Sequence, residues 1–385
     1  MCFTKLVTHS WPLVLAAFLM AGTGSIPSAA GAQAPAAGVD EKVNWKPNRG
    51  DARPVEYVGA PGCAHCHRAI FDKQNGTDMA LAAVRPADSR ILRQHPALST
   101  EQGPYTYSIT SDGGHVLFSV RDAHGRIEEP VVLIIGAGTL HENYLYERSG
   151  KLYQAPVSYY STVGKLVFTG STGQAPATLE AALGAPLTDE RVRQCIGCHT
   201  TAAGLGDSVD LEHLTLGVHC EACHGPGAQH VAAMRAGKLQ DTLIIAPARF
   251  NSDQEVAFCG TCHHGVPEVT RGELRGIRTV LSQPYRLIQS RCWNSADARS
   301  RCTFCHAAHR PTVRGETASY DSKCLSCHVA SAGAPLGGKQ LGKACPVAKR
   351  DCSSCHMPTI KVPGSESAFV DHRIRIVRAG APYPE

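Results

Sequence analysis

The sequence predicts a mainly α-helical and irregular fold into which one small antiparallel β-sheet is inserted. Three observations support this class. A five-residue motif, Cys-x-x-Cys-His, recurs along the chain; aromatic residues make up only 6% of the 385 residues; and a stretch rich in β-branched and aromatic residues separates the first motif from the others. With so few aromatic side chains, we expect something other than side chains to fill the interior.

The N-terminus has the pattern of a secretory signal peptide. Lys5 precedes an apolar run over residues 11–20, and small residues follow as far as 30–32. We therefore assign residues 1–32 to a cleaved signal peptide, with which Cys2 would be lost. An uncleaved anchor is the alternative, but the apolar run is about ten residues long and a spanning helix needs about 20. The pattern predicts export to the periplasm, and a cell-surface location stays open.

Seven copies of the motif use fourteen of the seventeen cysteines. Random placement of cysteine and histidine would give only about 0.04 copies in a chain of this composition. In chain order, motifs 1 to 7 hold the cysteine pairs Cys63 and Cys66, Cys195 and Cys198, Cys220 and Cys223, Cys259 and Cys262, Cys302 and Cys305, Cys324 and Cys327, and Cys352 and Cys355. The histidines that end them are His67, His199, His224, His263, His306, His328 and His356.

The spacing of the motif explains its chemistry. Two thiols separated by two residues can add to the two vinyl groups of one haem, and the adjacent histidine is then held under the iron as its proximal ligand. The sequence thus predicts seven covalently bound haem c groups. Zinc sites usually need two Cys-x-x-Cys halves, whereas this chain has an odd number, each followed by histidine. A thioredoxin-like dithiol would occur once rather than seven times.

Net charge gives little support to a nucleic-acid partner. The bare chain carries +5, or +4 without Lys5. Each ferric haem with two ionised propionates adds about −1, so seven haems bring the mature protein to about −3.

Four segments follow the signal peptide. Residues 33–55 are rich in Ala, Pro and charge and are predicted to be a flexible leader. Residues 56–103 hold motif 1 and a predicted helix over 68–84. Residues 104–185 are β-rich and form the predicted inserted sheet, for which we expect a scaffolding role rather than substrate binding. The predicted strands are 105–110, 115–120 and 130–135, and the predicted hairpin turns are 111–114, 122–125 and 148–151.

Residues 186–385 hold the other six motifs. They crowd into the 166 residues from Arg191 to His356, roughly one per 28, which is too few for a conventional core between them. We therefore expect short helices and loops to wrap the haems, giving a haem-packed multihaem cytochrome c. Such crowding would bring haems close enough for rapid electron hopping.

The sequence resembles the multihaem cytochromes of the cytochrome c-552/c-554 kind, including exported forms often fused to tetratricopeptide repeats. The stretches that carry the resemblance cover most of the mature chain: 58–63, 135–138, 144–146, 152–160, 220–227 with His230, 351–358 and 371–374. The resemblance implies a mostly helical, haem-packed structure with bis-histidine iron and a role in respiratory electron transfer. No tetratricopeptide array follows in this sequence, so docking through such repeats is not implied.

The resemblance also singles out Met79. Related proteins often place a distal histidine after the first motif, whereas this chain has Thr77-Asp-Met79-Ala80. Met79 is therefore a candidate distal ligand, which would raise the potential of that haem relative to bis-histidine neighbours.

Eleven histidines lie outside the motif ends in the mature chain, and seven irons need at most seven of them. The favoured distal candidates are His230, six residues beyond His224, and His309, three residues beyond His306, followed by His372 and His95. Less favoured are His115, His124, His141, His213 and His219, and we expect His65 and His264 to be solvent-facing or outside the ligand set.

Two leftover cysteines and the functional class complete the predictions. Cys292 and Cys345 could form a disulfide in an oxidising compartment, although sequence cannot fix connectivity. The favoured function is a pure electron carrier without catalytic residues. The alternative is an oxidoreductase acting on a small nitrogen or sulfur compound at one open haem, and a wire-forming subunit is a third class. The Cys-x-x-Cys-Lys motif of pentahaem nitrite reductases is absent from the sequence.

The partners that fit a carrier are a redox-protein donor and acceptor, or a quinol-linked membrane cytochrome. Peripheral contact with a membrane is compatible with this role, and the oligomeric state is not set by the sequence.

Overall fold

The structure is a computed structural model. It describes residues 56–136, 140–170, 176–202, 211, 213–238, 243–271, 274–313, 315, 317–328, 345–378, 380 and 382–383, all within the unit 41–385. The expected signal peptide, residues 1–32, and the expected leader, residues 33–55, lie outside the described residues.

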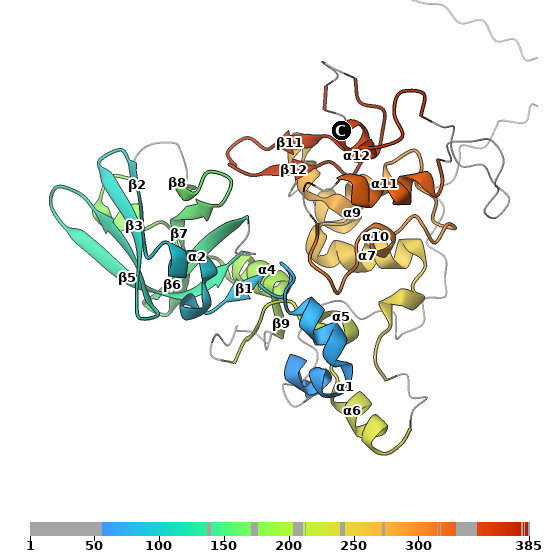
Figure 1. The fold of residues 1–385 in the computed structure, drawn as a ribbon. Helices are drawn as coiled ribbons and strands as arrows, with labels where there is room; N and C mark the ends of the chain where they lie inside the picture. Colours follow the sequence, from blue (N-terminus) through green and yellow to red (C-terminus); the bar gives the residue numbers. More distant parts are fainter. Residues whose placement is uncertain are drawn as a thin grey trace, which may run out of the picture. The chain divides into compact units, whose positions relative to one another are not determined.

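One large antiparallel sheet occupies the chain between motifs 1 and 2. Its strands follow one another in the order β2-β3-β4-β5-β6-β7-β8, and the short β1 pairs with β5. The first and last strands of this order, β2 and β8, also lie against each other, so the sheet nearly closes on itself. Figure 1 shows these strands as arrows in the teal-to-green part of the chain. The strands are β1 (Ala83–Val84), β2 (Ala97–Gln102), β3 (Tyr105–Asp112), β4 (His115–Arg121), β5 (Arg126–Ile135), β6 (His141–Arg148), β7 (Lys151–Tyr160) and β8 (Lys165–Phe168).

A conventional hydrophobic core fills the inside of this sheet. Alternate residues of β3 and neighbouring strands point inward, as the period of two in a strand requires. Tyr107, Phe118, Tyr144 and Tyr146 are fully buried, and the Phe118 and Tyr146 ring centroids are 5.3 Å apart. The phenol of Tyr146 donates to the Leu183 carbonyl at 2.8 Å. The sheet therefore needs no haem to fill its interior.

The expectation of a mainly α and irregular fold with a small sheet is wrong. The sheet has eight strands and starts before residue 104, at Ala83. The low aromatic content was misleading because it is an average over the chain: the tyrosines gather in residues 105–160, where they form the core. The three strands expected at 105–110, 115–120 and 130–135 are present, as β3, β4 and β5.

The expected hairpin turns are also present. Gly113 and Gly114 have positive φ between β3 and β4, and Ser149 and Gly150 have positive φ between β6 and β7. Asp122 accepts hydrogen bonds from the amides of residues 124 and 125 in the turn before β5.

Short helices carry the motifs. The helices are α1 (Gly59–Gln74), α2 (Arg90–Gln94), α3 (Leu179–Ala182), α4 (Asp189–His199), α5 (Cys220–His224), α6 (Ala228–Arg235), α7 (Ser252–His263), α8 (Val266–Thr270), α9 (Gln283–Ile288), α10 (Cys302–Cys305), α11 (Thr317–Leu325) and α12 (Cys352–His356), with 3-10 turns at Pro86–Asp88, Pro247–Arg249 and Gly276–Leu281. Two small hairpins, β9 (Thr200–Ala202) with β10 (Thr215–Leu216) and β11 (Thr359–Lys361) with β12 (Ala368–Val370), join them.

The helix expected over 68–84 is displaced towards the N-terminus. Helix α1 begins at Gly59, contains motif 1 and ends at Gln74, and Met79 lies in the turns that follow. Asn75-Gly76 comes directly after the helix, and these residues favour turns over helix continuation.

Motif 2 packs against the sheet. Ile196 lies between the two cysteines of motif 2 on α4 and is fully buried against Leu133, Leu145 and Leu214 in a second hydrophobic cluster. Both core clusters of the structure lie between Ala83 and Leu216; after Leu216, the described residues form no such cluster. None of the described helices is long and apolar enough to cross a membrane.

Candidate functional site

Each motif lies on, or ends, a short helix. Helices α4, α5, α7 and α12 end at the motif histidine, and α10 places His306 directly after its last residue. Helix α1 continues past motif 1, but its backbone kinks at His67 (φ −113°, ψ 41°). One helical turn brings the two cysteines of a motif to the same side, with the histidine beside them.

Cysteines of different motifs lie side by side in four places. Here the thiols stand in for the thioether sulfurs of attached haems. The neighbouring thiol pairs are Cys63 with Cys220, Cys198 with Cys262, Cys259 with Cys302, and Cys324 with Cys352. The pKa of Cys63 is raised by the neighbouring Cys220 thiol and by burial, whereas the Cys63 thiol lowers the pKa of Cys220 to about 7.

These contacts link all seven motifs into one network. The helices of motifs 1 and 3, 2 and 4, 4 and 5, 5 and 6, and 6 and 7 pack against each other in pairs. Motif 3 is joined to motif 2, because α5 packs against β9, which directly follows motif 2, and the His219 amide donates to the Thr201 hydroxyl at 2.8 Å. Motif 4 contacts motifs 2 and 5, and the remaining motifs connect through these. Figure 1 shows α7, α10, α11 and α12 close together.

Backbone carbonyls orient three motif histidines. The Nδ1 atom of His199 donates to the Ala82 carbonyl at 3.0 Å, that of His224 to Ile245 at 2.7 Å, and that of His356 to Arg375 at 2.9 Å. A proton held on Nδ1 leaves Nε2 with its lone pair available for a metal, which is how proteins fix the tautomer of a ligating histidine.

Two of the expected distal histidines face motif histidines. The ring centroids of His309 and His224 are 6.0 Å apart with their planes at 18°, and those of His372 and His306 are 6.2 Å apart with their planes at 38°. Imidazole nitrogens bond transition metals at about 2.0 to 2.1 Å and a ring centroid lies roughly 1.1 Å from its nitrogen, so two rings on opposite sides of one iron have centroids roughly 6.3 Å apart. Both spacings fit one iron between the rings.

The two distal candidates lie far along the sequence from the motif histidines that they face. His309 follows motif 5 but faces the histidine of motif 3, and His372 faces that of motif 5. His372 is held by its own Nδ1, which donates to the Val370 carbonyl at 3.0 Å, and burial lowers its pKa to about 4.

The other three candidates are not matched to a motif histidine by any ring contact among the described residues. His230 lies on α6, and its buried Nδ1 has no hydrogen-bond partner in the described part of the chain. His95 is exposed and packs against Tyr159 at 5.9 Å. Met79 is half-buried, and its carbonyl accepts from the amide of Val218 at 2.8 Å.

His141 is a residue that sequence reasoning ranked low. It lies at the start of β6, with its buried Nδ1 lacking a hydrogen-bond partner among the described residues. Burial and the nearby His199 lower its pKa. His141 lies in a strand far from motif 2 in the sequence, so no residue spacing relates it to that motif. The fold brings His141 near His199.

The donor set fits haem better than zinc. Among the described residues, no three His, Cys, Asp or Glu side chains converge on a point that could hold one metal ion, whereas a structural zinc needs four such donors. Covalent haem needs two cysteines for the thioether bonds and one or two further side chains for the iron, because the porphyrin itself supplies four of the iron ligands. Helices α5, α10 and α12 are only four or five residues long and belong to no hydrophobic cluster of side chains. Porphyrins packed between such helices could therefore form the core.

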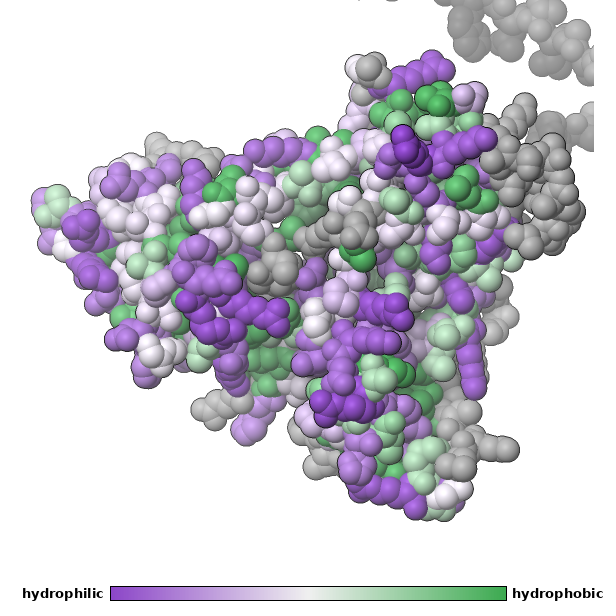
Figure 2. Space-filling view, in the orientation of Figure 1, coloured by the Kyte–Doolittle hydropathy of each residue, from purple (hydrophilic) through white to green (hydrophobic). Residues whose placement is uncertain are grey.

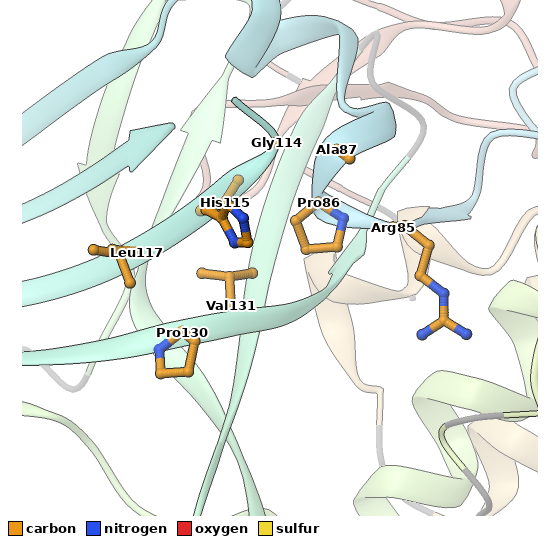
Figure 3. Close-up of a pocket in the computed structure, with 9 residues that line it drawn as sticks. Arg85, Pro86, Ala87, Gly114, His115, Leu117, Pro130 and Val131 are labelled. Carbon is orange, nitrogen blue, oxygen red and sulfur yellow. The ribbon is translucent and has the colours of Figure 1, made fainter. Parts of the chain in front are cut away.

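The sheet carries one shallow pocket, which has no motif residue in its lining. It measures about 240 Å³ and is lined by residues of β4, β5 and the Pro86–Asp88 turn, with His115 and Arg85 as its ionisable groups. Figure 3 shows the His115 side chain between Leu117 and Pro86. Ligand sites usually exceed about 300 Å³, so the pocket gives no support to substrate binding by the sheet.

Cys292 and Cys345 do not form a disulfide in this structure. Both are free and exposed. The nearby sulfurs of Cys327 and Cys324 contribute to the raised pKa of Cys292, after burial.

Comparisons with known proteins agree with this chemistry. The family model described as cytochrome c554 and c-prime matches residues 171–225, which contain motifs 2 and 3. The crystal structure of the outer cell wall cytochrome OcwA is similar with a TM-score of 0.50 and 14% identity, over 84% of this chain and 80% of that chain. At this identity the likeness concerns the fold. No curated protein matches the chain significantly.

Proposed function

We propose that this chain, a multihaem c-type cytochrome of electron transfer, carries seven covalently bound haems, most of them with two histidine ligands, and serves respiration outside the cytoplasmic membrane. The observation that carries the proposal is the network of contacts that joins all seven motifs. The family match over motifs 2 and 3 supports covalent haem c.

Haem iron, when bound, supplies a one-electron couple. The residues of the chain attach each haem and orient its histidine ligand. Motif cysteines fix each group to its helix, and carbonyl-held histidines such as His199 and His224 present Nε2 in a fixed direction. A second histidine bound to the same iron would keep substrates away from the metal and limit structural change during electron transfer. His309, whose ring faces that of His224, is placed to be such a ligand.

Export is supported by the N-terminal sequence pattern and by the name of the structural neighbour, an outer cell wall cytochrome. The surface fits brief contacts with redox partners. On the face seen in Figure 2, hydrophobic residues form small areas separated by hydrophilic ones. Weak electron-transfer complexes bury little surface and need no large apolar patch. A protein donor and acceptor, or a quinol-linked membrane cytochrome, are the partners that we propose.

The intact mass of the purified protein tests the haem count and export together. We expect the mass of residues 33–385 plus seven haems. Electron paramagnetic resonance of the oxidised protein then tests the role. Low-spin ferric signals alone support a carrier, whereas a high-spin signal that changes with nitrite, hydroxylamine or cyanide would contradict it and favour an oxidoreductase. A colourless protein with zinc or disulfides would overturn the whole proposal.

A further inference from the structure

Three buried carboxylates each connect two motifs. Glu221 and Glu255 are 1% exposed and Asp321 is 7% exposed. Each lies within four residues of the first cysteine of its own motif and accepts hydrogen bonds from the backbone at the start of another motif's helix. This arrangement occurs at motifs 1 and 3, 4 and 5, and 6 and 7.

Glu221 of motif 3 holds the start of α1, which contains motif 1. Its two carboxylate oxygens accept from the amides of Val58 at 2.9 Å and Gly59 at 2.8 Å. The Gly227 amide also donates to it at 2.8 Å, which fixes the carboxylate within its own loop. The thiols of Cys220 and Cys63, one from each motif, are neighbours.

Glu255 holds the start of α10 in the same way. It lies four residues before Cys259 on α7 and accepts from the amide and the hydroxyl of Thr303 at 2.7 and 2.9 Å. Arg301 approaches the same carboxylate at 3.6 Å. Residues four apart share a helix face, so the carboxylate and the motif 4 cysteine both face motif 5.

Asp321 holds the start of α12. It lies three residues before Cys324 on α11 and accepts from the amides of Asp351 at 2.7 Å and Cys352 at 2.9 Å. These hydrogen bonds, led by that of Cys352, lower the pKa of Asp321.

The carboxylates take the place of side-chain caps that the receiving helices lack. Within the described residues, α1, α10 and α12 have no side-chain cap from their own N-cap positions. In contrast, α4 is capped by its own Thr188 and α7 by its own Asn251. The first amides of a helix are left without partners inside it and carry partial positive charge, so a carboxylate stabilises them strongly.

We propose that Glu221, Glu255 and Asp321 are positioning residues that clamp haem-bearing motifs into three pairs, 1 with 3, 4 with 5, and 6 with 7. The proposal rests on the proposed function, since it assumes that haem occupies these motifs. Each carboxylate belongs to one member of a pair and holds the first helical turn of the other. Its negative charge therefore lies beside both members and favours the oxidised iron in both.

Alanine substitution at each carboxylate tests the clamp. We expect Glu221→Ala, Glu255→Ala and Asp321→Ala to keep the full set of haems by mass, and each to move the midpoint potentials of two haems to more positive values in a redox titration followed by electron paramagnetic resonance. Hydrogen exchange at the released amides, Val58 and Gly59 for the first variant, should be about tenfold faster or more, because a hydrogen bond to a charged group is lost.

Thr188→Ala is the matched control, because it removes a helix cap that belongs to the same motif segment as the helix. It should alter the potential of one haem. If the carboxylate variants also alter one haem each, they are ordinary caps and the clamp is overturned; unchanged potentials and exchange rates overturn it as well. Where an alanine variant yields no holoprotein, Glu221→Gln, Glu255→Gln and Asp321→Asn keep the volume and one acceptor while removing the charge, and the same two-haem shift is expected.

The haem mass of the wild-type protein separates this proposal from the proposed function. A wild-type mass without haem would contradict the function before any variant is made. A full haem complement with single-haem effects in the variants would contradict the clamp alone.

Discussion

Arg286 and Asp371 form a buried two-point ion pair. The Nε and Nη2 atoms of Arg286 lie 2.9 and 3.0 Å from the two carboxylate oxygens, and neither side chain is exposed. Arg375 reaches the same carboxylate at 2.6 Å, and the Tyr383 ring lies 4.6 Å from the Arg286 guanidinium. Although burial acts to raise it, the pKa of Asp371 is lowered because Arg286 donates to it. The pair thus anchors the residue directly before His372.

Removing Arg286 should destabilise the protein strongly. Arg286→Met would leave the buried Asp371 charge with only the Arg375 guanidinium and the Arg373 amide among its described partners, and breaking a buried pair costs about 3–5 kcal/mol. Urea unfolding followed by circular dichroism measures the change. The control is Arg68→Ala, which removes an exposed pair with Asp72 and should cost less than about 1 kcal/mol. Equal effects of the two substitutions would contradict the assigned role of the buried pair.

Removing a distal histidine should open one haem. We expect His372→Ala and His309→Ala each to convert one low-spin ferric haem to a high-spin or water-bound form, because each removes the ring that faces a motif histidine. Electron paramagnetic resonance with spin counting measures this. His124→Ala, in the exposed turn before β5, should leave the spectrum unchanged. An unchanged spectrum for His372→Ala would mean that another residue ligates that iron.

Each motif should account for one haem. Replacing both Cys63 and Cys66 by alanine should lower the intact mass by one haem, since motif 1 has no other cysteines for thioether bonds. Replacing Cys292 and Cys345 is the matched control, because neither belongs to a Cys-x-x-Cys-His motif, and the haem mass should not change. A loss of haem in the control would show that these two cysteines take part in attachment.

The contact between motif 2 and the sheet should be worth several kcal/mol. Ile196→Ala removes a fully buried side chain and leaves a cavity, so we expect a loss of about 2–5 kcal/mol in unfolding free energy with all haems retained. His65→Ala changes a residue between the cysteines of motif 1 that is exposed, and it should have little effect. Denaturant titration of both variants decides whether the sheet supports motif 2.

The chemistry could be predicted from the sequence because it is local. A cysteine pair and its histidine occupy five consecutive residues, so neither fold nor partner is needed to recognise them. The matching of distal ligands is different. His309 and His224 are far apart in the chain, and no sequence spacing relates them; the sequence could offer His309 as a candidate but not say which motif it faces.

Two strands, β2 and β7, explain why the sequence predicts a smaller sheet than the structure contains. β2 contains Ser, Thr, Glu and Gln and is mostly exposed, so its sequence resembles a loop. β7 contains Pro156, which argues against a strand interior, but the register between β6 and β7 shifts near this residue and accommodates it. The tyrosines that fill the interior of the sheet are close together in the sequence, but the aromatic content averaged over the whole chain does not reveal this.

Motif 4 connects the two halves of the network of motif contacts among the described residues. Cys262 lies beside Cys198 of motif 2 and Cys259 lies beside Cys302 of motif 5, whereas motifs 1 and 3 reach motif 4 by way of motif 2. Loss of the haem at motif 4 would therefore separate motifs 1 to 3 from motifs 5 to 7. Loss of the haem at motif 7 would remove only one end of the network.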